Sequence, residues 1–284
     1  YTLVYTLSLH DALPICIIDD LITYRLQDGF YRLVVNAATR DTDLAWMRER
    51  LAEFDLEVTE RDDLAMIAVQ GPDAVEHVVE VLGAPPVADL KPFRSTVHGD
   101  FFVARTGYTG EDGCELILPN GLAAPMWRKL VDRDVVPCGL GARDSLRLEA
   151  GLNLYGQDMD TSTTPLESNL AWTVALAPEE RAFIGREALE AQKRDGVDRK
   201  LVGLLFPPGG IPRQGAAVHA ETGEGEVTSG GFGPTVERPV AMARVPAGAD
   251  GEVEVELRGR RLKAAVVKLP FVRNGKPRDG LPLA

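Results

Sequence analysis

The segment RTGYTGEDGCELIL, residues 105–118, says most about how this chain folds. It places glycines at 107, 110 and 113 between two apolar runs that have the composition of β-strands. This turn is richer in glycine than a chain reversal requires, so we expect its backbone to approach a ligand closely. The turn places Glu115 at the start of the second strand. Its two carboxylate oxygens suit a planar ligand edge with two neighbouring N–H donors; the alternative is a turn carrying a solvated glutamate.

A second informative segment is GLGARDSLRLEAGLNLYGQDM, residues 139–159. Its charged residues crowd a short helix, expected over 143–150, whose start follows glycines, and such a helix start is a natural anion site. Arg143 and Arg147 stand one helical turn apart and can share a face. The alternative is a salt-bridge network on the surface, which would carry little meaning.

An acidic pair, Asp19 and Asp20, interrupts the apolar strand IIDDLITYRL at residues 17–26. Side chains alternate across a strand, so we expect the two carboxylates to face opposite sides and only one to point inward. An inward carboxylate is costly to bury unless it is paired or used in chemistry. The alternative is a surface charge at the end of a hairpin, whose turn we expect at residues 27–29.

The composition excludes several classes of protein. The chain has 284 residues, of which 45% are hydrophobic and 26% charged, as in ordinary globular proteins. Its net charge of −12 is opposite to that of a typical nucleic-acid binder, so we expect no nucleic-acid partner. No apolar run approaches the roughly 20 residues that a membrane-spanning helix needs, so we expect no membrane association. These features predict a cytoplasmic protein, or one of the mitochondrial matrix in a eukaryote.

Cofactor motifs are missing as well. The sequence contains no phosphate-binding loop, no dinucleotide fingerprint and no nucleophile elbow. The cysteines are widely spaced and form no CxxC pair, and the histidines form no metal-binding spacing. We therefore expect neither a metal site nor disulfide bonds. The cysteines stand at positions 16, 114 and 138.

The element pattern predicts an α+β protein with antiparallel sheets flanked by helices and a C-terminal β-barrel module. We expect helices over 39–54, 72–82 and 122–131. From about residue 201 the chain consists of strands with Gly and Pro between them. Residues 1–15 resemble a translated adapter sequence and are interpreted as a non-native leader, the alternative being an apolar strand. The expected division is 1–15 leader, 16–176 first domain, 177–200 linker with a short helix over 186–193, and 201–284 barrel domain.

Taken in order, eight segments resemble the T protein of the glycine cleavage system, an aminomethyltransferase family, and the resemblance runs from about residue 17 to 273. GYTGEDG-x-E and ARDSLRLEAG are highly specific to its folate-binding superfamily. The eight segments are IIDDLITYRL (17–26), VVNAATRDTDLAWM (34–47), RTGYTGEDGCELILP (105–119), GLGARDSLRLEAGLNLYGQDM (139–159), TPLESNLAW (164–172), FIGREAL (183–189), GGIPRQG (209–215) and GEVTSGGFGPTVERPVAMA (225–243).

The resemblance implies a three-lobed molecule with tetrahydrofolate, its cosubstrate, in a central channel. The other substrate would be the aminomethyl group on the lipoyl arm of the H protein, the expected partner. Tetrahydrofolate takes the methylene carbon, and ammonia and the dihydrolipoyl H protein leave. The family has no covalently held cofactor. The family also begins with a segment that helps to build the channel, and LPIC (13–16) stands where asparagine, glutamate and two glycines are usual. We therefore expect the natural N-terminus to be missing.

Carried over residue by residue, the resemblance implies that Asp20 is the carboxylate beside the reacting folate nitrogens, where it positions the pterin and assists proton transfer. Glu115 would grip the pterin edge, whose amino-pyrimidinone group has the two N–H donors described above, and Arg143 would orient it. The remaining implied folate-binding residues are Tyr24, Asn36, Tyr108, Arg213 and Arg273.

Three other functions stay open at this point. The first is the iron–sulfur maintenance protein of the same superfamily, which carries a cysteine-bearing KGCYxGQE-type motif where this chain has GYTGEDG. The second is the folate domain of a dimethylglycine or sarcosine oxidase, whose chain also carries a flavin-binding domain. The third is a folate-binding scaffold without catalysis.

Overall fold

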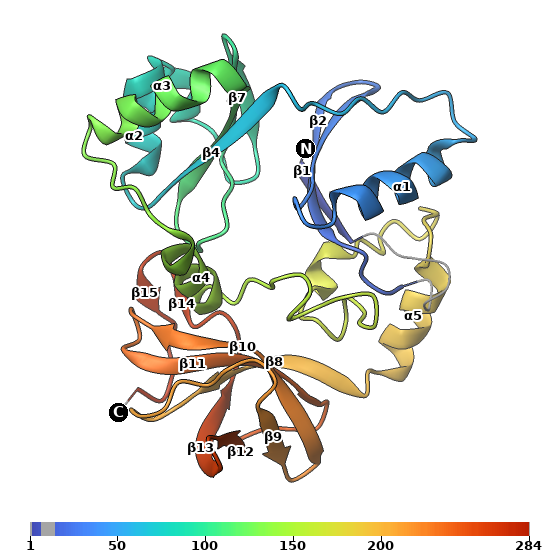
Figure 1. Ribbon diagram of the computed structural model, residues 1–284. Helices are drawn as coiled ribbons and strands as arrows, with labels where there is room; N and C mark the ends of the chain where they lie inside the picture. The colour runs from blue at the N-terminus through green and yellow to red at the C-terminus, as the bar shows by residue number, and fades with distance from the viewer. Residues whose placement is uncertain (1, 7–14, 284) are drawn as a thin grey trace.

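The computed structural model describes residues 2–6 and 15–283. It is an α+β molecule of three lobes, and helix α4 (Leu140–Glu149) lies between the second lobe and the third (Figure 1). The strands of its three larger sheets pair in antiparallel fashion, and helices flank the sheets of the first two lobes. The third lobe is a closed barrel. The fold class predicted from the sequence is confirmed.

The first lobe is a three-stranded sheet in the order β1-β2-β3, with helix α1 beside it. The predicted hairpin is present, and Gly29 adopts the left-handed φ of 73° that its tight turn needs. Residues 2–6 form a strand paired with β2, as in the alternative interpretation of the leader; residues 1 and 7–14 lie outside the described residues. The elements are β1 (Thr2–Thr6), β2 (Asp20–Gln27), β3 (Phe30–Val34) and α1 (Arg40–Leu51).

The second lobe is a four-stranded sheet in the order β4-β7-β6-β5, packed against α2 and α3. Helix α2 ends at Gly83, which has a left-handed φ of 61°, as the sequence predicted. The lobe has its own core, which includes Val78, Leu116 and Leu130. Its elements are β4 (Leu64–Gln70), α2 (Ala74–Leu82), β5 (Ser95–His98), β6 (Phe101–Ala104), β7 (Gly113–Pro119) and α3 (Asn120–Val131).

The sheets of the first two lobes meet through aromatic side chains. The buried ring of Tyr24 on β2 packs edge-on against Phe102 on β6, with 4.9 Å between the ring centroids. The Arg32 guanidinium covers the same Phe102 ring at 4.6 Å. This contact fixes β2 beside the glycine-rich turn, although the two segments are about 80 residues apart in the chain.

The third lobe is a barrel in the order β10-β11-β8-β13-β12-β9. The sequence did not predict β10 as a strand, because its glycines give it low strand propensity. Those glycines allow close packing: a Cβ on Gly230 would lie 2.7 Å from the Pro212 carbonyl oxygen. The elements from the linker onward are α5 (Arg186–Asp195), β8 (Arg199–Leu205), β9 (Ala217–Ala220), β10 (Gly223–Gly233), β11 (Arg238–Pro246), β12 (Glu252–Leu257), β13 (Arg260–Val267), β14 (Val272–Arg273) and β15 (Lys276–Pro277).

Buried charges attach α4 to the barrel. Arg147 is 2% exposed, pairs with the buried Asp158 at 2.8 Å and donates to Ser229 of β10 at 3.0 Å. Glu149, also buried, accepts from the backbone N–H groups of Thr235 (2.8 Å) and Val236 (3.1 Å). The surface salt-bridge alternative is therefore wrong for this helix: its second half is an interior anchor that holds the barrel against the other lobes.

Candidate active site

The two carboxylates of Asp19 and Asp20 meet at a single amide group. Asn36 Nδ2 lies 2.9 Å from Asp19 Oδ1 and 3.2 Å from Asp20 Oδ1, and it also donates to the Asp20 carbonyl at 3.1 Å. Our expectation that the two carboxylates face opposite sides is wrong, because β2 begins at Asp20 and Asp19 therefore precedes the alternating strand. Thr39 donates a further hydrogen bond to Asp19 Oδ2 at 2.7 Å. The surface-charge alternative is also wrong, since Asp19 is completely buried.

The pKa of Asp20 is raised from 3.8 to about 6. Burial is the largest cause, because it disfavours the charged carboxylate, and the neighbouring charge of Asp19 adds to it. The hydrogen bond from Asn36 and the positive charge of Arg143 act in the opposite direction. A carboxyl group whose pKa lies close to neutral pH can both take up and release a proton, as a general acid or base must.

Tyr24 and Glu115 are connected through Thr106, which was not among the residues singled out from the sequence. The Thr106 hydroxyl donates to Glu115 Oε2 at 2.5 Å and lies 3.2 Å from the Tyr24 hydroxyl. Since Thr106 has one hydroxyl proton, which Glu115 receives, the Tyr24 hydroxyl is the donor to Thr106. Burial raises the pKa of Tyr24 to about 12, so that it stays a donor. The one available signal for Thr106 was its place beside Gly107 in the RTGYTG turn.

Tyr108 and Arg143 form a second pair. The Arg143 guanidinium lies over the Tyr108 ring, 4.6 Å from its centroid, and the Tyr108 hydroxyl donates to the Asn153 carbonyl. Burial is the main cause of the raised pKa of Tyr108, to which the charge of Asp20 also contributes, whereas Arg143 lowers it. The charge of Arg143 thus acts on both Tyr108 and Asp20, and its guanidinium is in direct contact with the Tyr108 ring.

The glycines of the turn have a packing role that we did not expect. A Cβ on Gly107 would overlap the Gln70 side chain, at 1.8 Å from Oε1, and one on Gly110 would lie 2.6 Å from the Cβ of Ala150. Gln70 in turn donates to the Thr106 carbonyl at 3.0 Å. The close backbone approach is therefore to Gln70 and to the end of α4, and it holds the turn in place.

The remaining predicted basic residues occupy three different positions. Arg147 is buried at the barrel and does not share the exposed position of Arg143. Arg273 is exposed on β14, next to Asn274, whose N–H donates to the Gly110 carbonyl at 3.1 Å. Arg213 is exposed in the loop between β8 and β9. The structure thus brings Arg273 to the edge of the turn and leaves Arg213 on the barrel.

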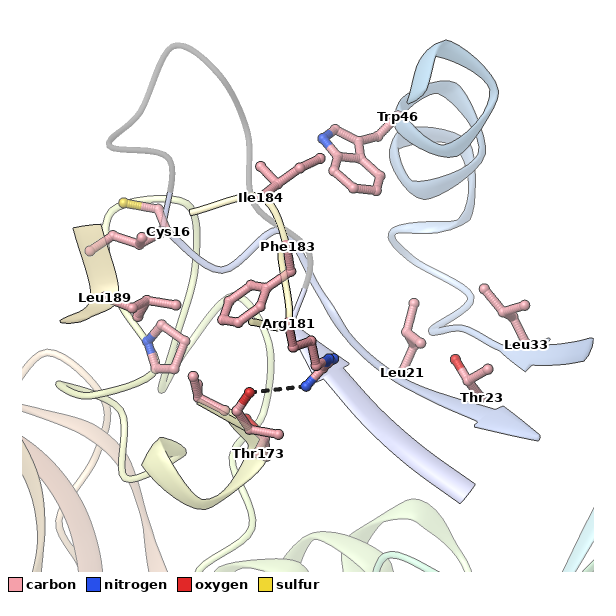
Figure 2. Close-up of a pocket in the computed structure, with 14 residues that line it drawn as sticks. Cys16, Leu21, Thr23, Leu33, Trp46, Thr173, Arg181, Phe183, Ile184 and Leu189 are labelled. Atoms are coloured by element: carbon pink, nitrogen blue, oxygen red, sulfur yellow. Dashed lines mark hydrogen bonds between the residues drawn. The ribbon is translucent and has the colours of Figure 1, made fainter. Parts of the chain in front are cut away.

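A separate cavity of about 260 Å³ lies on the other side of β2. Figure 2 shows Leu21 and Thr23 of β2 at this cavity, together with Trp46 of α1 and Phe183. Asp20 and Tyr24 occupy the alternate positions of the same strand, so they project from its opposite face. None of the described residues that line the cavity carries a carboxylate, and its Arg181 donates to the Ala175 carbonyl at 3.0 Å. This apolar cavity is therefore distinct from the acidic cluster.

Three further observations concern the described part of the chain. No group of three or more His, Cys, Asp or Glu side chains there is arranged to hold a metal ion. No helix within residues 2–6 and 15–283 is long and apolar enough to cross a membrane. Cys16, Cys114 and Cys138 are free thiols, the first two buried and the third exposed.

Comparison with known proteins agrees with this architecture. The family model of the GCVT N-terminal domain matches residues 2–178, and that of the glycine cleavage T-protein C-terminal barrel domain matches 199–273. An aminomethyltransferase of Nitrosococcus oceani is 54% identical over 263 residues, covering 92% of this chain and 71% of its own length. One of Methylococcus capsulatus is 53% identical over 258 residues, covering 90% and 71% respectively.

A solved structure shows the same fold. The crystal structure of the glycine cleavage system aminomethyltransferase T from Bartonella henselae superposes with a TM-score of 0.87 at 36% sequence identity. The match covers 97% of this chain and 77% of that one. The two family models together span both the sheets that build the acidic cluster and the barrel. This chain belongs to the glycine cleavage T-protein family.

Proposed function

We propose that this protein is a tetrahydrofolate-dependent aminomethyltransferase of the glycine cleavage system. It transfers the methylene carbon of the aminomethyl group on lipoylated H protein to tetrahydrofolate and releases ammonia. Two relatives more than 50% identical to it bear the name aminomethyltransferase. The structural observation that supports the proposal is the Arg143 guanidinium of α4 lying over the Tyr108 ring of the glycine-rich turn, with its charge acting on the buried carboxyl group of Asp20.

Glu115 fits the amino-pyrimidinone edge of a pterin. Among the described residues only Thr106 donates to it, and that bond occupies one lone pair of Oε2. Oε1 and the second lone pair of Oε2 remain available for two adjacent N–H donors, which is the pattern on that edge. The bond from Thr106 also orients the carboxylate, so binding costs less conformational entropy than it would with a freely rotating side chain.

Asp20 has the ionisation behaviour that the transfer needs. Overall, two protons leave the N5 and N10 nitrogens of tetrahydrofolate as both bond to the methylene carbon. One of these two protons ends on the lipoyl sulfur, whose bond to the methylene carbon breaks. The other ends on the departing ammonia, whose bond to the same carbon breaks. With a pKa of about 6, Asp20 takes a proton from an attacking nitrogen near neutral pH and passes it on. Asn36 holds its carboxylate in one orientation.

Arg143 and Tyr108 supply a planar, positively charged surface. The guanidinium stacked on the Tyr108 ring is exposed on its other side and forms no ion pair with the described residues. It can therefore stack on, or donate to, an electron-rich heterocycle. Its positive charge also favours the ionised form of Asp20, which keeps the base available. Arg213 and Arg273 remain predictions as folate-binding residues.

The partner follows from the proposed reaction, in which the aminomethyl group arrives on the lipoyl arm of the H protein. The cytoplasm is the proposed location. The two folate-binding alternatives without aminomethyl transfer receive no support from the relatives found, which bear the name of the transferase. A scaffold without catalysis would bind tetrahydrofolate and produce no methylene-tetrahydrofolate.

The test uses aminomethylated, lipoylated H protein and tetrahydrofolate. The purified chain is expected to form methylene-tetrahydrofolate and ammonia in equal amounts, and Asp20→Asn is expected to slow both. Omitting tetrahydrofolate is the control for spontaneous ammonia release. Binding of tetrahydrofolate without either product would support the scaffold, and absence of both binding and turnover would contradict the proposal.

A further inference from the structure

Behind the acidic pair lies a third carboxyl group, Asp43, which the proposed reaction does not use. It is on α1, one turn after Thr39, and it is completely buried. Neither of its oxygens accepts a hydrogen bond within the described part of the chain. A buried carboxylate without donors is strongly disfavoured, and the ordinary solution is to bind a proton.

The neighbour of Asp43 is another carboxylate. The Asp43 and Asp19 side chains lie within hydrogen-bonding reach, and both are 0% exposed. The Thr39 hydroxyl stands beside both of them but has a single proton, which it donates to Asp19 Oδ2 at 2.7 Å. Two carboxylates in contact need a proton between them, because both are acceptors when ionised.

We propose that Asp43 is a positioning residue that carries a proton and donates it in a hydrogen bond to Asp19, so that Asp19 holds Asn36 against Asp20. The chain of contacts runs from Asp43 to Asp19, from Asp19 to Asn36 Nδ2 at 2.9 Å, and from Nδ2 to Asp20 Oδ1 at 3.2 Å. Asp43 thereby sets the orientation of Asp20 without adding a negative charge to it.

The surrounding charges agree with a neutral Asp43. Burial and the adjacent Asp19 raise the pKa of Asp43 from 3.8 to about 7. The other ionisable groups that face it are Asp20 and the Tyr155 phenol, whose own pKa is raised to about 12 by burial and by these carboxylates. Arg50, two turns further along α1, pairs with Glu49 at 3.3 Å. These neighbours thus favour the protonated form of Asp43.

Infrared spectroscopy of the wild-type chain tests the proton directly. At about pH 6, the difference spectrum between wild type and Asp43→Asn is expected to show the C=O stretch of a protonated carboxylic acid, lost in the variant. Asp41→Asn, an exposed position of the same helix, is the control and is expected to show no such loss. Asn keeps the shape and the hydrogen-bond donor, so this variant does not depend on tolerance of a cavity. Absence of the band from the difference spectrum between wild type and Asp43→Asn would overturn the inference.

Kinetics test the positioning role, and this part rests on the proposed function. Because Asn is neutral and can donate to Asp19, Asp43→Asn is expected to keep the acidic limb of the pH–rate profile in place. If Asp43 were charged in the wild type, its replacement would lower the pKa of Asp20 and move that limb to lower pH by about one unit. Such a shift would contradict the inference. Asp43→Ala is expected to lower kcat about tenfold or more with KM for tetrahydrofolate nearly unchanged. A chain without transferase activity that still shows the infrared band would contradict the proposed function alone.

Discussion

Tyr24 and Glu115, on strands of two different sheets, are joined through one hydroxyl group, that of Thr106. The connection runs from the Tyr24 hydroxyl to Thr106 Oγ1 at 3.2 Å and on to Glu115 Oε2 at 2.5 Å. Tyr24 is 2% exposed, whereas Glu115 is half-buried. The orientation of the carboxylate proposed to bind folate therefore depends on the packing of the first sheet against the second.

Replacing Glu115 with Gln tests the pterin contact. The amide keeps one acceptor oxygen but loses the charge and the second acceptor, so tetrahydrofolate binding is expected to weaken by about 1–3 kcal/mol. Calorimetric titration with a tetrahydrofolate analogue measures the change. Glu53→Gln, an exposed position, is the matched control and is expected to bind as the wild type does. Equal affinities in all three proteins would remove Glu115 from the site.

Thr106→Val tests the connection itself. The substitution keeps the shape of the side chain but leaves the buried Tyr24 hydroxyl without its acceptor. We expect the free energy of unfolding to fall by about 1–3 kcal/mol and folate affinity to fall as well, because Glu115 loses its orienting donor. Urea denaturation and the same titration measure both effects. The exposed Thr161→Val is the control. If Thr106→Val keeps both the stability and the folate affinity of the wild type, the Thr106 hydroxyl supports neither of them.

Asp20→Asn is expected to slow turnover while leaving folate affinity nearly intact, because the proposed role of Asp20 lies in the reacting complex. In the wild type the base form is needed, so the rate is expected to rise with pH through the Asp20 pKa of about 6 and then level off. In the variant this rise of the rate with pH is expected to disappear. Steady-state rates across the pH range provide the measurement, and a variant as fast as the wild type would exclude Asp20 from the mechanism.

The raised pKa of Asp20 also predicts how stability depends on pH. The folded-state pKa of about 6 exceeds the ordinary 3.8, so folding favours the protonated form. This contribution is fully present below about pH 4 and is lost as the pH rises through 6. Asp20→Asn is therefore expected to gain stability relative to wild type between about pH 4 and pH 8, by at most about 3 kcal/mol. Urea unfolding at both pH values measures it, with the exposed Asp100→Asn as control; a difference independent of pH would contradict the shift.

Arg147→Met is expected to destabilise the joint between α4 and the barrel. The substitution leaves the buried Asp158 without its cation, although Ser229 and the Leu154 N–H still donate to it. Because these donors remain, we expect a loss of about 3 kcal/mol, the lower end for a broken buried pair. Denaturation provides the measurement. The exposed Arg194→Met, which removes a surface pair, is expected to cost less than about 1 kcal/mol. Equal losses in the two variants would mean that the buried pair is not an anchor.

The sequence by itself determined the local elements and the family. Strand-like runs around a polar turn predicted the hairpin of β2 and β3, and Pro72 and Gly83 marked the ends of the helix that contains α2. Apolar spacing and apolar runs predicted α1, α3 and most strands of the barrel. The motifs drew attention to Asp20, Glu115 and Arg143, and the family resemblance gave these residues their expected roles and added Tyr108. The glycine-rich strand β10 was not predicted, because glycine carries no side chain to show a period.

Only the tertiary structure decided which of these side chains meet and which are buried. Asp19 and Asp20 converge on Asn36 because the strand begins between them, and strand alternation therefore does not apply to Asp19. Thr106 and Asp43 gain their roles from partners on other elements of the fold. The physical reason is that hydrophobic periodicity depends on residues that are neighbours in the sequence. Hydrogen-bond partners and burial depend instead on how segments distant in the chain pack together.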